Sequence, residues 1–284
     1  MKAKTLLKLG LSVLIIWLVL RSIDEKLLWG TLRQAHPGWL LWAAVWFGLS
    51  KLISAVRFNL LLAAEQVSLS GPENLRLYWL GMYYNLLLPG GISGDAYKIK
   101  WLMDRFGATF KRMFAVALLD RLGGVVALGQ WCLVLAFGLP VFRPFWWVLA
   151  AGLAASVPVS WFVYKKSGAE LYRVWGRTSW LSVGVQAAQL VSTLGIILAL
   201  SESERWLEYS VLFLVSSVVA MLPLTIGGTG ARELTFLWGA GLLGIDPQKA
   251  VAIAFLFYLI STAVAFAGIA FSFSNEKLMG VDNG

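Results

Sequence analysis

The sequence contains one cysteine, Cys132, and one histidine, His36. A single cysteine excludes an intrachain disulfide and a cysteine-based metal cluster. Cys132 stands in an apolar run, where a thiol packs as a small hydrophobic side chain. His36 precedes Pro37 in a connector, which favours an interfacial position over metal ligation or proton transfer. We therefore expect no bound metal and no cofactor.

Charged residues are also scarce, at 14% of the chain, whereas hydrophobic residues make up 59% and the mean hydropathy is +0.74. This composition excludes an ordinary soluble domain and is typical of a polytopic membrane protein. Acidic residues are outnumbered by basic ones, and the net charge is +9. Cytoplasmic loops of membrane proteins are rich in Lys and Arg, so this excess does not indicate nucleic-acid binding.

Motifs of several large enzyme classes are missing. The sequence has no phosphate-binding loop of the Walker type, no His-Glu-x-x-His and no Gly-x-Ser-x-Gly. Each of these patterns places a nucleotide, a zinc ion or a nucleophilic serine in its class of enzyme. Their absence favours a protein that is not an enzyme.

Six apolar segments approach or reach the length of a membrane-spanning helix. They cover about residues 6–20, 37–57, 113–138, 145–164, 180–200 and 249–273. Lys2, Lys4 and Lys8 precede the first segment, and no small-residue cleavage pattern follows it, which favours a retained helix over a signal peptide. The Lys and Arg residues of the connectors predict a multi-pass protein of the inner (cytoplasmic) membrane with both termini in the cytoplasm.

Two further apolar segments are interrupted by proline and glycine. They cover residues 73–101, broken at Pro89, and residues 209–243, broken at Pro223. Broken backbone cannot face lipid, so it must be buried in protein or line a wet cavity. The flanking charges return the first segment to the cytoplasm and the second to the outside. We therefore expect two re-entrant hairpins, with tilted full spans as the alternative.

These segments form two similar halves within a single transmembrane domain, residues 1–284. Each half, about 37–138 and about 180–273, consists of a span, a hairpin and a span, and one extra span inverts the second half. The predicted fold is an all-α polytopic membrane protein with about six full spans and two re-entrant broken-helix hairpins in an inverted repeat. In transporters of this design the broken helices meet at the substrate site.

The glycines and charges at the two breaks are the candidate site. A helix that restarts after a break points free N–H groups at it, and such a terminus binds phosphate-like anions. Asp95 either caps its own helix or pairs with a cation. Arg232 opposes the helix dipole, so we expect it to face an anion such as Glu233 or a lipid phosphate. The candidate transport residues are Asn85, Gly90, Gly91, Gly94, Asp95, Lys98, Asp120, Arg121, Gly227, Gly228, Gly230, Arg232 and Glu233.

Asp120 and Arg121 lie inside a predicted full span. Ionisable residues at such depth are costly and usually functional. Sequence neighbours point in different directions on a helix, so each needs its own partner. We predict that Arg121 pairs with Asp95 or Glu233; a purely structural ion-pair network is the alternative. Lys51, in another span, is assigned a structural role in which its side chain snorkels to the interface.

Three ordered motifs resemble those of the lysylphosphatidylglycerol synthase transmembrane (flippase) family. They are Pro-Gly-Gly-Ile-Ser-Gly-Asp-Ala-Tyr at residues 89–97, Asp-Arg-Leu-Gly-Gly at 120–124 and Pro-x-Thr-x-Gly-Gly-x-Gly-x-Arg-Glu at 223–233. Asp120 departs from the family, which more often has Glu before the Arg. The resemblance implies a stand-alone flippase-like unit, because the sequence has no counterpart of the soluble aminoacyl-transfer domain of the bifunctional members.

Together these observations predict a lipid flippase or transporter that moves an anionic or phosphate-bearing amphiphilic lipid between the leaflets of the inner membrane. The alternative is an intramembrane transferase acting on a polyprenyl- or phospholipid-linked substrate, with Asp95 or Glu233 as the general base. A third hypothesis is a membrane subunit that scaffolds lipid-pathway enzymes. The expected partner is a membrane lipid, either a phospholipid or an isoprenoid-linked lipid, and not nucleic acid; homo-oligomers and pathway enzymes remain open as partners.

Overall fold

The computed structural model describes residue 30 and residues 33–87, 93–221 and 231–273. Every regular element in these residues is a helix, so the chain is all-α as predicted. The α-helices are α3 (Pro37–Ala64), α4 (Gly71–Leu87), α5 (Ser93–Phe106), α6 (Phe110–Ala136), α7 (Trp146–Ser167), α8 (Ala169–Arg173), α9 (Trp175–Ala199), α10 (Trp206–Met221), α11 (Ala231–Leu243), α12 (Pro247–Phe266) and α13 (Gly268–Phe273). The 3-10 turns η1 (Pro140–Phe145) and η2 (Ser203–Arg205) precede α7 and α10.

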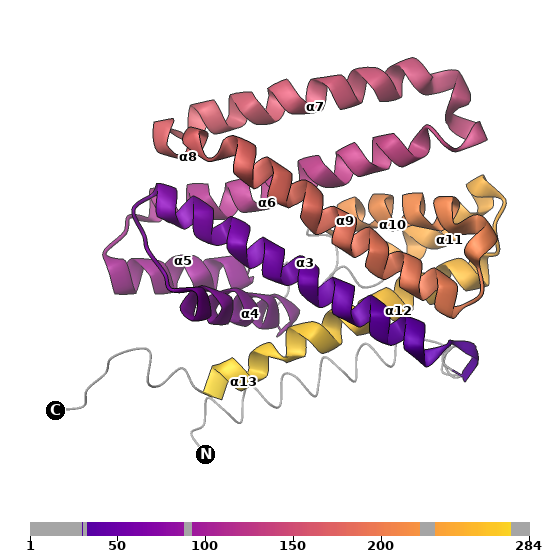
Figure 1. Ribbon diagram of the computed structural model, residues 1–284, viewed down its shortest axis with the longest axis horizontal. Coiled ribbons are helices and arrows are strands. Elements are labelled where there is room, and N and C mark those ends of the chain that lie inside the picture. Colours follow the sequence, from indigo (N-terminus) through magenta and orange to yellow (C-terminus); the bar gives the residue numbers. More distant parts are fainter. Residues whose placement is uncertain (1–29, 31–32, 88–92, 222–230, 274–284) are drawn as a thin grey trace.

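Within the described residues, five helical segments are long and apolar enough to cross a membrane. They are Pro37–Ala64, Phe110–Ala136, Pro140–Ser167, Trp175–Ala199 and Pro247–Phe271. These segments run roughly along the longest axis of the molecule (Figure 1). They correspond to five of the six predicted spans, and the remaining one, residues 6–20, lies outside the described residues. The protein is therefore a polytopic helical membrane protein.

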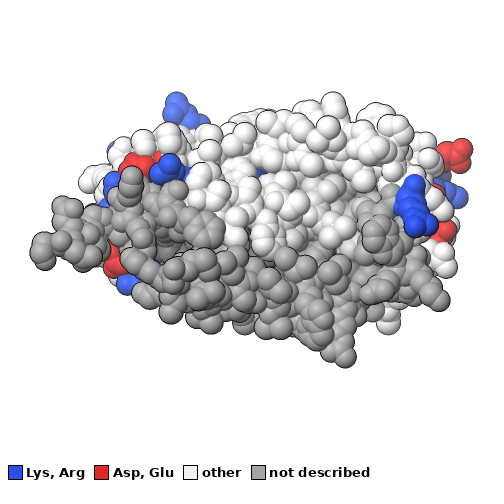
Figure 2. All heavy atoms as spheres, turned by 90° about the horizontal axis from the view of Figure 1, so that it is seen from below, with Lys and Arg blue, Asp and Glu red and all other residues white. Residues whose placement is uncertain are grey.

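The distribution of charge agrees with that assignment. Figure 2 shows charged side chains at both ends of the long axis and an almost uncharged described surface between them. Large apolar side chains such as those of Leu41, Trp180 and Trp238 lie on the surface, with exposed fractions of 68%, 78% and 77%. In water such a surface would be a liability, whereas lipid tails cover it at no cost.

The two interrupted segments form helical hairpins. Helix α4 packs against α5, and α10 packs against α11. The α4–α5 hairpin lies at one end of the long axis and the α10–α11 hairpin at the other (Figure 1). The connections at residues 88–92 and 222–230 lie outside the described residues. The two hairpins therefore approach the middle of the molecule from opposite ends, as the predicted inverted repeat requires.

The packing of the helices also follows the predicted halves. Helices α3 and α9, which open the two halves, pack side by side along the centre of the molecule (Figure 1). The last span of each half touches the hairpin of the other half, α6 against α10 and α12 against α4. Helix α7, the extra span, packs mainly on α6 at the edge of the bundle. Division of the chain into repeats at residues 37–138 and 180–273 remains a prediction that these contacts support.

Glycine permits the close approach of the two arms in each hairpin. A Cβ atom on Gly94 would lie 1.8 Å from the carbonyl oxygen of Gly81, so the backbones of α5 and α4 touch here. A Cβ atom on Gly239 of α11 would lie 2.1 Å from a methyl group of Leu212 of α10. Small residues at helix interfaces allow this separation inside a membrane, where helix association depends on close packing.

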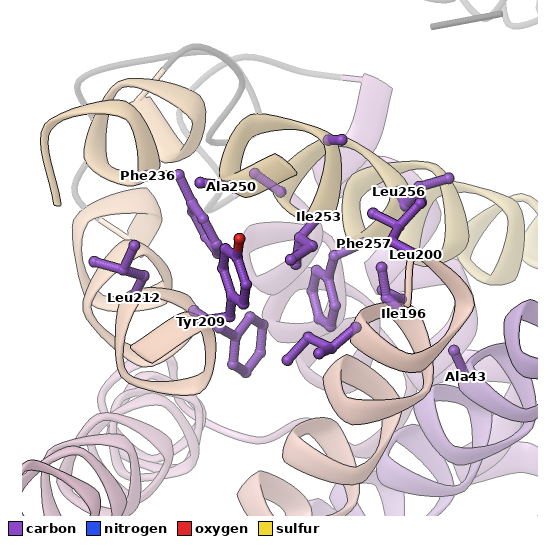
Figure 3. Packing of buried hydrophobic residues seen from close by; sticks show 14 of the residues in the cluster. Ala43, Ile196, Leu200, Tyr209, Leu212, Phe236, Ala250, Ile253, Leu256 and Phe257 are labelled. Carbon is purple, nitrogen blue, oxygen red and sulfur yellow. The ribbon is translucent and has the colours of Figure 1, made fainter. Parts of the chain in front are cut away.

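The α10–α11 hairpin is held by an apolar core. Tyr209, Phe213 and Phe236 are fully buried, and they pack with Phe257 of α12 (Figure 3). The rings of Phe213 and Phe257 are 4.6 Å apart between centroids. After Lys249, α12 has no charged residue. This half of the molecule is thus assembled mainly by van der Waals packing.

The last predicted span, residues 249–273, is not one continuous helix. Helix α12 ends at Phe266 and α13 begins at Gly268. The indole nitrogen of Trp79 in α4 donates a hydrogen bond to the carbonyl of Val264, at 3.1 Å. A Cβ atom on Gly268 would lie 2.6 Å from the carbonyl oxygen of Trp79. A side chain that takes a carbonyl from a helix interrupts the hydrogen-bond ladder of that helix, and the sequence pattern contains no sign of it.

Candidate functional site

A polar cavity of about 240 Å³ lies in the middle of the molecule. Its walls come from both halves, because α3, α4, α5 and α6 meet α9 and α10 there. The described lining residues are Lys51, Ser54, Arg57, Tyr78, Gly81, Met82, Asn85, Asp95, Lys98, Asp120, Arg121, Gly124, Val185, Gln186, Gln189 and Met221. Five of the predicted site residues, Asn85, Asp95, Lys98, Asp120 and Arg121, are among them.

Asp95 is paired with two cations. One carboxylate oxygen, Oδ1, lies 2.8 Å from Nζ of Lys98, one turn further along α5. The other oxygen, Oδ2, accepts a hydrogen bond from Nε of Arg121 on α6. Asp95 and Lys98 are buried, at 9% and 5% exposure. The predicted pairing of Arg121 with Asp95 is therefore present, and the carboxylate joins the hairpin to the neighbouring full span.

Asn85 supplies the cap at the start of α5. Its Oδ1 accepts a hydrogen bond from the backbone N–H of Gly94, at 2.8 Å. The hydroxyl of Ser93 donates to the carbonyl of Tyr84 at 3.0 Å and so ties the same two helices together. Because a residue of α4 satisfies this free N–H group, both oxygens of Asp95 remain available for Lys98 and Arg121. Of the two roles considered for Asp95, the geometry supports the ion pair.

Asp120 has a separate partner on α3. Nε of Arg57 lies 2.8 Å from Oδ1 of Asp120, and Nη1 of Arg57 donates to the hydroxyl of Ser182 on α9 at 2.9 Å. The side chains of Arg57 and Asp120 are 5% and 9% exposed. Asp120 and Arg121 thus turn to different helices, as expected for sequence neighbours on a helix.

Sequence reasoning missed Arg57. The sequence-based boundary ended the second span near this residue, which placed the guanidinium at the membrane surface. In the structure α3 continues to Ala64, so Arg57 is about 10 Å inside the helix end at 1.5 Å per residue. The apolar run Phe58–Ala64 that follows Arg57 is the signal that extends the helix.

The described cavity lining carries an excess of positive charge. Two carboxylates, Asp95 and Asp120, face four cations. The cations are Lys51, Arg57, Lys98 and Arg121. Among these groups only Lys51 is in no ion pair within 4.0 Å with a described carboxylate. A cavity with this balance favours an anionic guest over a neutral or cationic one.

Arg232 lies in the other half, at the start of α11. Nη1 of Arg232 is 3.3 Å from the hydroxyl of Ser216 and 3.2 Å from that of Ser217, both on α10. Its guanidinium carbon lies 5.7 Å and 5.0 Å from the ring centroids of Phe213 and Phe257. Arg232 is not one of the described residues that line the polar cavity. Its predicted interaction with an anion remains a prediction.

The remaining predicted residues fall outside the described part of the chain. They are Gly90, Gly91, Gly227, Gly228, Gly230 and the side chain of Glu233. Their roles stay predictions. Among the residues that the structure describes, no group of three or more His, Cys, Asp or Glu side chains is placed to hold a metal ion.

A second pocket is apolar and lies between α6, α7 and α9. Its volume is about 380 Å³. Gly123 on α6 is part of its wall, whereas its neighbour Gly124 lines the polar cavity. Helix α6 therefore separates a charged compartment from an apolar one that is suited to hydrocarbon.

The described helices, with two opposed hairpins around a buried charged cavity, place this chain in the class of polytopic helical membrane proteins. The sequence profile described as "Lysylphosphatidylglycerol synthase TM region" matches residues 5–170 and 158–268. The chain belongs to this family, as its three motifs indicated. No curated protein sequence matches the chain significantly.

Proposed function

We propose that this protein moves an anionic, phosphate-bearing amphiphilic lipid between the two leaflets of the membrane. The observation that carries the proposal is the positively charged cavity at the inner ends of the opposed hairpins. A headgroup requires a polar path across the apolar layer, and acyl chains require an apolar one. Membership of a lipid-related family supports this function for the chain.

The alternative of an intramembrane transferase has less support. Asp95, its candidate base, has each carboxylate oxygen bound to a cation, Oδ1 to Lys98 and Oδ2 to Arg121. A general base must come within hydrogen-bond reach of the proton that it removes, and these two cations compete with a substrate for the carboxylate. The other candidate base, Glu233, has a side chain outside the described residues.

Lipid movement can be measured in vesicles that contain the purified protein and a fluorescent lipid that dithionite quenches only in the outer leaflet. We expect labelled phosphatidylglycerol, or a labelled polyprenyl phosphate, to exchange between leaflets faster than in protein-free vesicles. Zwitterionic phosphatidylcholine should exchange more slowly than the preferred anion. The two anionic probes distinguish a glycerophospholipid from an isoprenoid carrier. Equal rates with and without folded protein for all three lipids would overturn the proposal.

We further propose that the end of the molecule bearing the α4–α5 hairpin faces the cytoplasm of a bacterial-type inner membrane. Cations outnumber anions at that end. The cations are Lys100, Arg105, Lys111, Arg112, Lys165, Lys166, Arg173 and Arg177, and the anions are Glu65, Glu73, Asp104 and Glu170. The positive-inside rule assigns such an end to the cytoplasm.

Single cysteines introduced after replacement of Cys132 test this orientation. Cysteines at Lys100 and Lys165 should be shielded from an impermeant thiol reagent added outside intact cells, whereas a cysteine at Ser203 should be labelled. All three should react after the membrane is opened. External labelling at Lys100, together with labelling at Ser203, would make residues 73–101 a full span and would contradict the inverted repeat.

A further inference from the structure

Lys51 lies too far from either end of α3 to reach the membrane surface. The helix extends 14 residues before it and 13 after it, or about 20 Å in each direction at 1.5 Å per residue. Its earlier assignment as a snorkelling residue at a helix end therefore does not hold. Lys51 instead lines the polar cavity on the side where α3 faces α9.

The surroundings of Lys51 offer its ammonium group an aromatic ring but no described carboxylate. Its Nζ lies 4.4 Å from the ring centroid of Phe47. No described carboxylate lies within 4.0 Å of it. The other charged groups of the described cavity lining are all in ion pairs with one another. A partly buried cation in such a position is costly unless an anion joins it.

A second polar group of this cavity has an unused hydrogen-bonding atom. Gln186 of α9 is 5% exposed, and its Nε2 donates to the carbonyl of Gly124 at 3.3 Å. Its Oε1 is buried and accepts no hydrogen bond from a described residue. A buried side-chain oxygen usually accepts a hydrogen bond from a donor. The hydroxyl of a bound headgroup would provide one.

We propose that Lys51 and Gln186 form the headgroup subsite of the cavity, in which Lys51 binds the phosphate and Gln186 accepts a hydrogen bond from a hydroxyl of the same headgroup. This inference rests on the proposed lipid transport and names the chemistry of its substrate, a phosphodiester that carries a hydroxylated headgroup. A lysine is suited to the task because its ammonium group is a compact charge with three rotatable donors. The phosphate would supply the counter-charge that Lys51 lacks among the described residues.

Lys51 and Arg57 are the two cations that α3 contributes to the described cavity lining. Arg57 is already held by Asp120 and Ser182. Lys51 has no competing carboxylate among the described residues. It is therefore the cation that an incoming phosphate meets without first breaking an ion pair.

The test compares Lys51→Gln with Lys100→Gln in vesicles, using labelled phosphatidylglycerol. Lys100 is exposed and pairs with Asp104 at 3.0 Å, so its replacement removes the same charge far from the cavity. We expect Lys51→Gln to slow exchange by about tenfold or more, because the loss of one charge-assisted hydrogen bond to the phosphate corresponds to a rate factor of this size. Its thermal unfolding midpoint should equal or exceed that of the wild type, because the variant removes a partly buried cation that has no described carboxylate partner. Lys100→Gln should leave both values unchanged.

The Gln186 part of the subsite predicts selectivity rather than rate alone. Phosphatidylglycerol carries headgroup hydroxyls, whereas phosphatidic acid has a phosphate and no further headgroup. Gln186→Met should therefore reduce the preference for phosphatidylglycerol over phosphatidic acid, and Lys51→Gln should slow both lipids. Lys51→Arg, which keeps the charge, should retain more activity than Lys51→Gln.

The outcomes separate this inference from the proposed function. If wild-type protein moves phosphatidylglycerol and Lys51→Gln moves it equally fast, the subsite is wrong and the transport function stands. A lower unfolding midpoint for Lys51→Gln with normal transport would make Lys51 a structural residue and would also overturn the subsite. If the wild type moves none of the anionic lipids, both proposals fail.

Discussion

Replacing Asp95 with asparagine is expected to cause a large loss of both stability and lipid movement. The neutral amide would leave Lys98 and Arg121 in the cavity without their shared counter-charge. Breaking a well-buried ion pair costs about 3–5 kcal/mol. Unfolding in detergent micelles measures the stability, and exchange of phosphatidylglycerol in vesicles measures the function. Asp104→Asn is the control on the same helix, because its pair with Lys100 is exposed and exposed pairs contribute about 1 kcal/mol or less.

The geometry also predicts an order among the partners of Asp95. Lys98→Gln or Arg121→Gln leaves the carboxylate with one cation, so each should cost less stability than Asp95→Asn. Adding Arg121→Gln to Asp95→Asn should recover only part of the loss, because Lys98 stays unpaired. Full recovery, or a larger effect for Arg121→Gln than for Asp95→Asn, would show that the shared carboxylate is not the centre of this network.

The second large effect is expected for Arg57→Gln. This change leaves Asp120 buried at the centre of the bundle and removes the hydrogen bond to Ser182. A cost of about 3–5 kcal/mol follows from the uncompensated charge. The double variant Arg57→Met/Asp120→Leu should restore most of the lost stability, since apolar side chains often replace a buried pair without cost. Chemical unfolding of the single and double variants gives the coupling energy.

Arg112→Gln is the matched control for that experiment. Arg112 of α6 pairs with Glu65 at the end of α3 at 2.6 Å, so this pair joins the same two helices. The side chain of Arg112 is 44% exposed, and the expected loss is about 1 kcal/mol or less. Similar losses for Arg57→Gln and Arg112→Gln would mean that water reaches Asp120 freely.

The helices and one ion pair could be predicted from the sequence because their signals are local or strongly constrained. Apolar length identifies the spans, and prolines beside glycines identify the breaks. Arg121 was paired with Asp95 or Glu233 because an isolated charge at membrane depth is too costly to remain alone. The charge bias of the flanking segments indicated the side of the membrane to which each hairpin returns.

Other parts of the site depend on packing that the sequence does not display. Arg57 was missed because a cation near an expected helix end resembles an interfacial residue, and only the continuation of α3 to Ala64 moves it inward. Lys51 was placed near a helix end for the same reason, whereas it lies in the middle of α3 and lines the cavity. The cap from Asn85 to Gly94 joins two helices across a break, and the interruption between α12 and α13 involves the distant Trp79.

The two hairpins are fastened by different kinds of contact. The α4–α5 hairpin is tied to α6 through Asp95, whereas α12, the equivalent neighbour of α10–α11, presents only uncharged side chains after Lys249. Ion pairs can exchange partners: a visiting phosphate offers Lys98 and Arg121 the same charge that Asp95 provides. An aromatic cluster offers no such exchange. A guest anion can therefore compete directly for the ion pair that fastens the α4–α5 hairpin to α6.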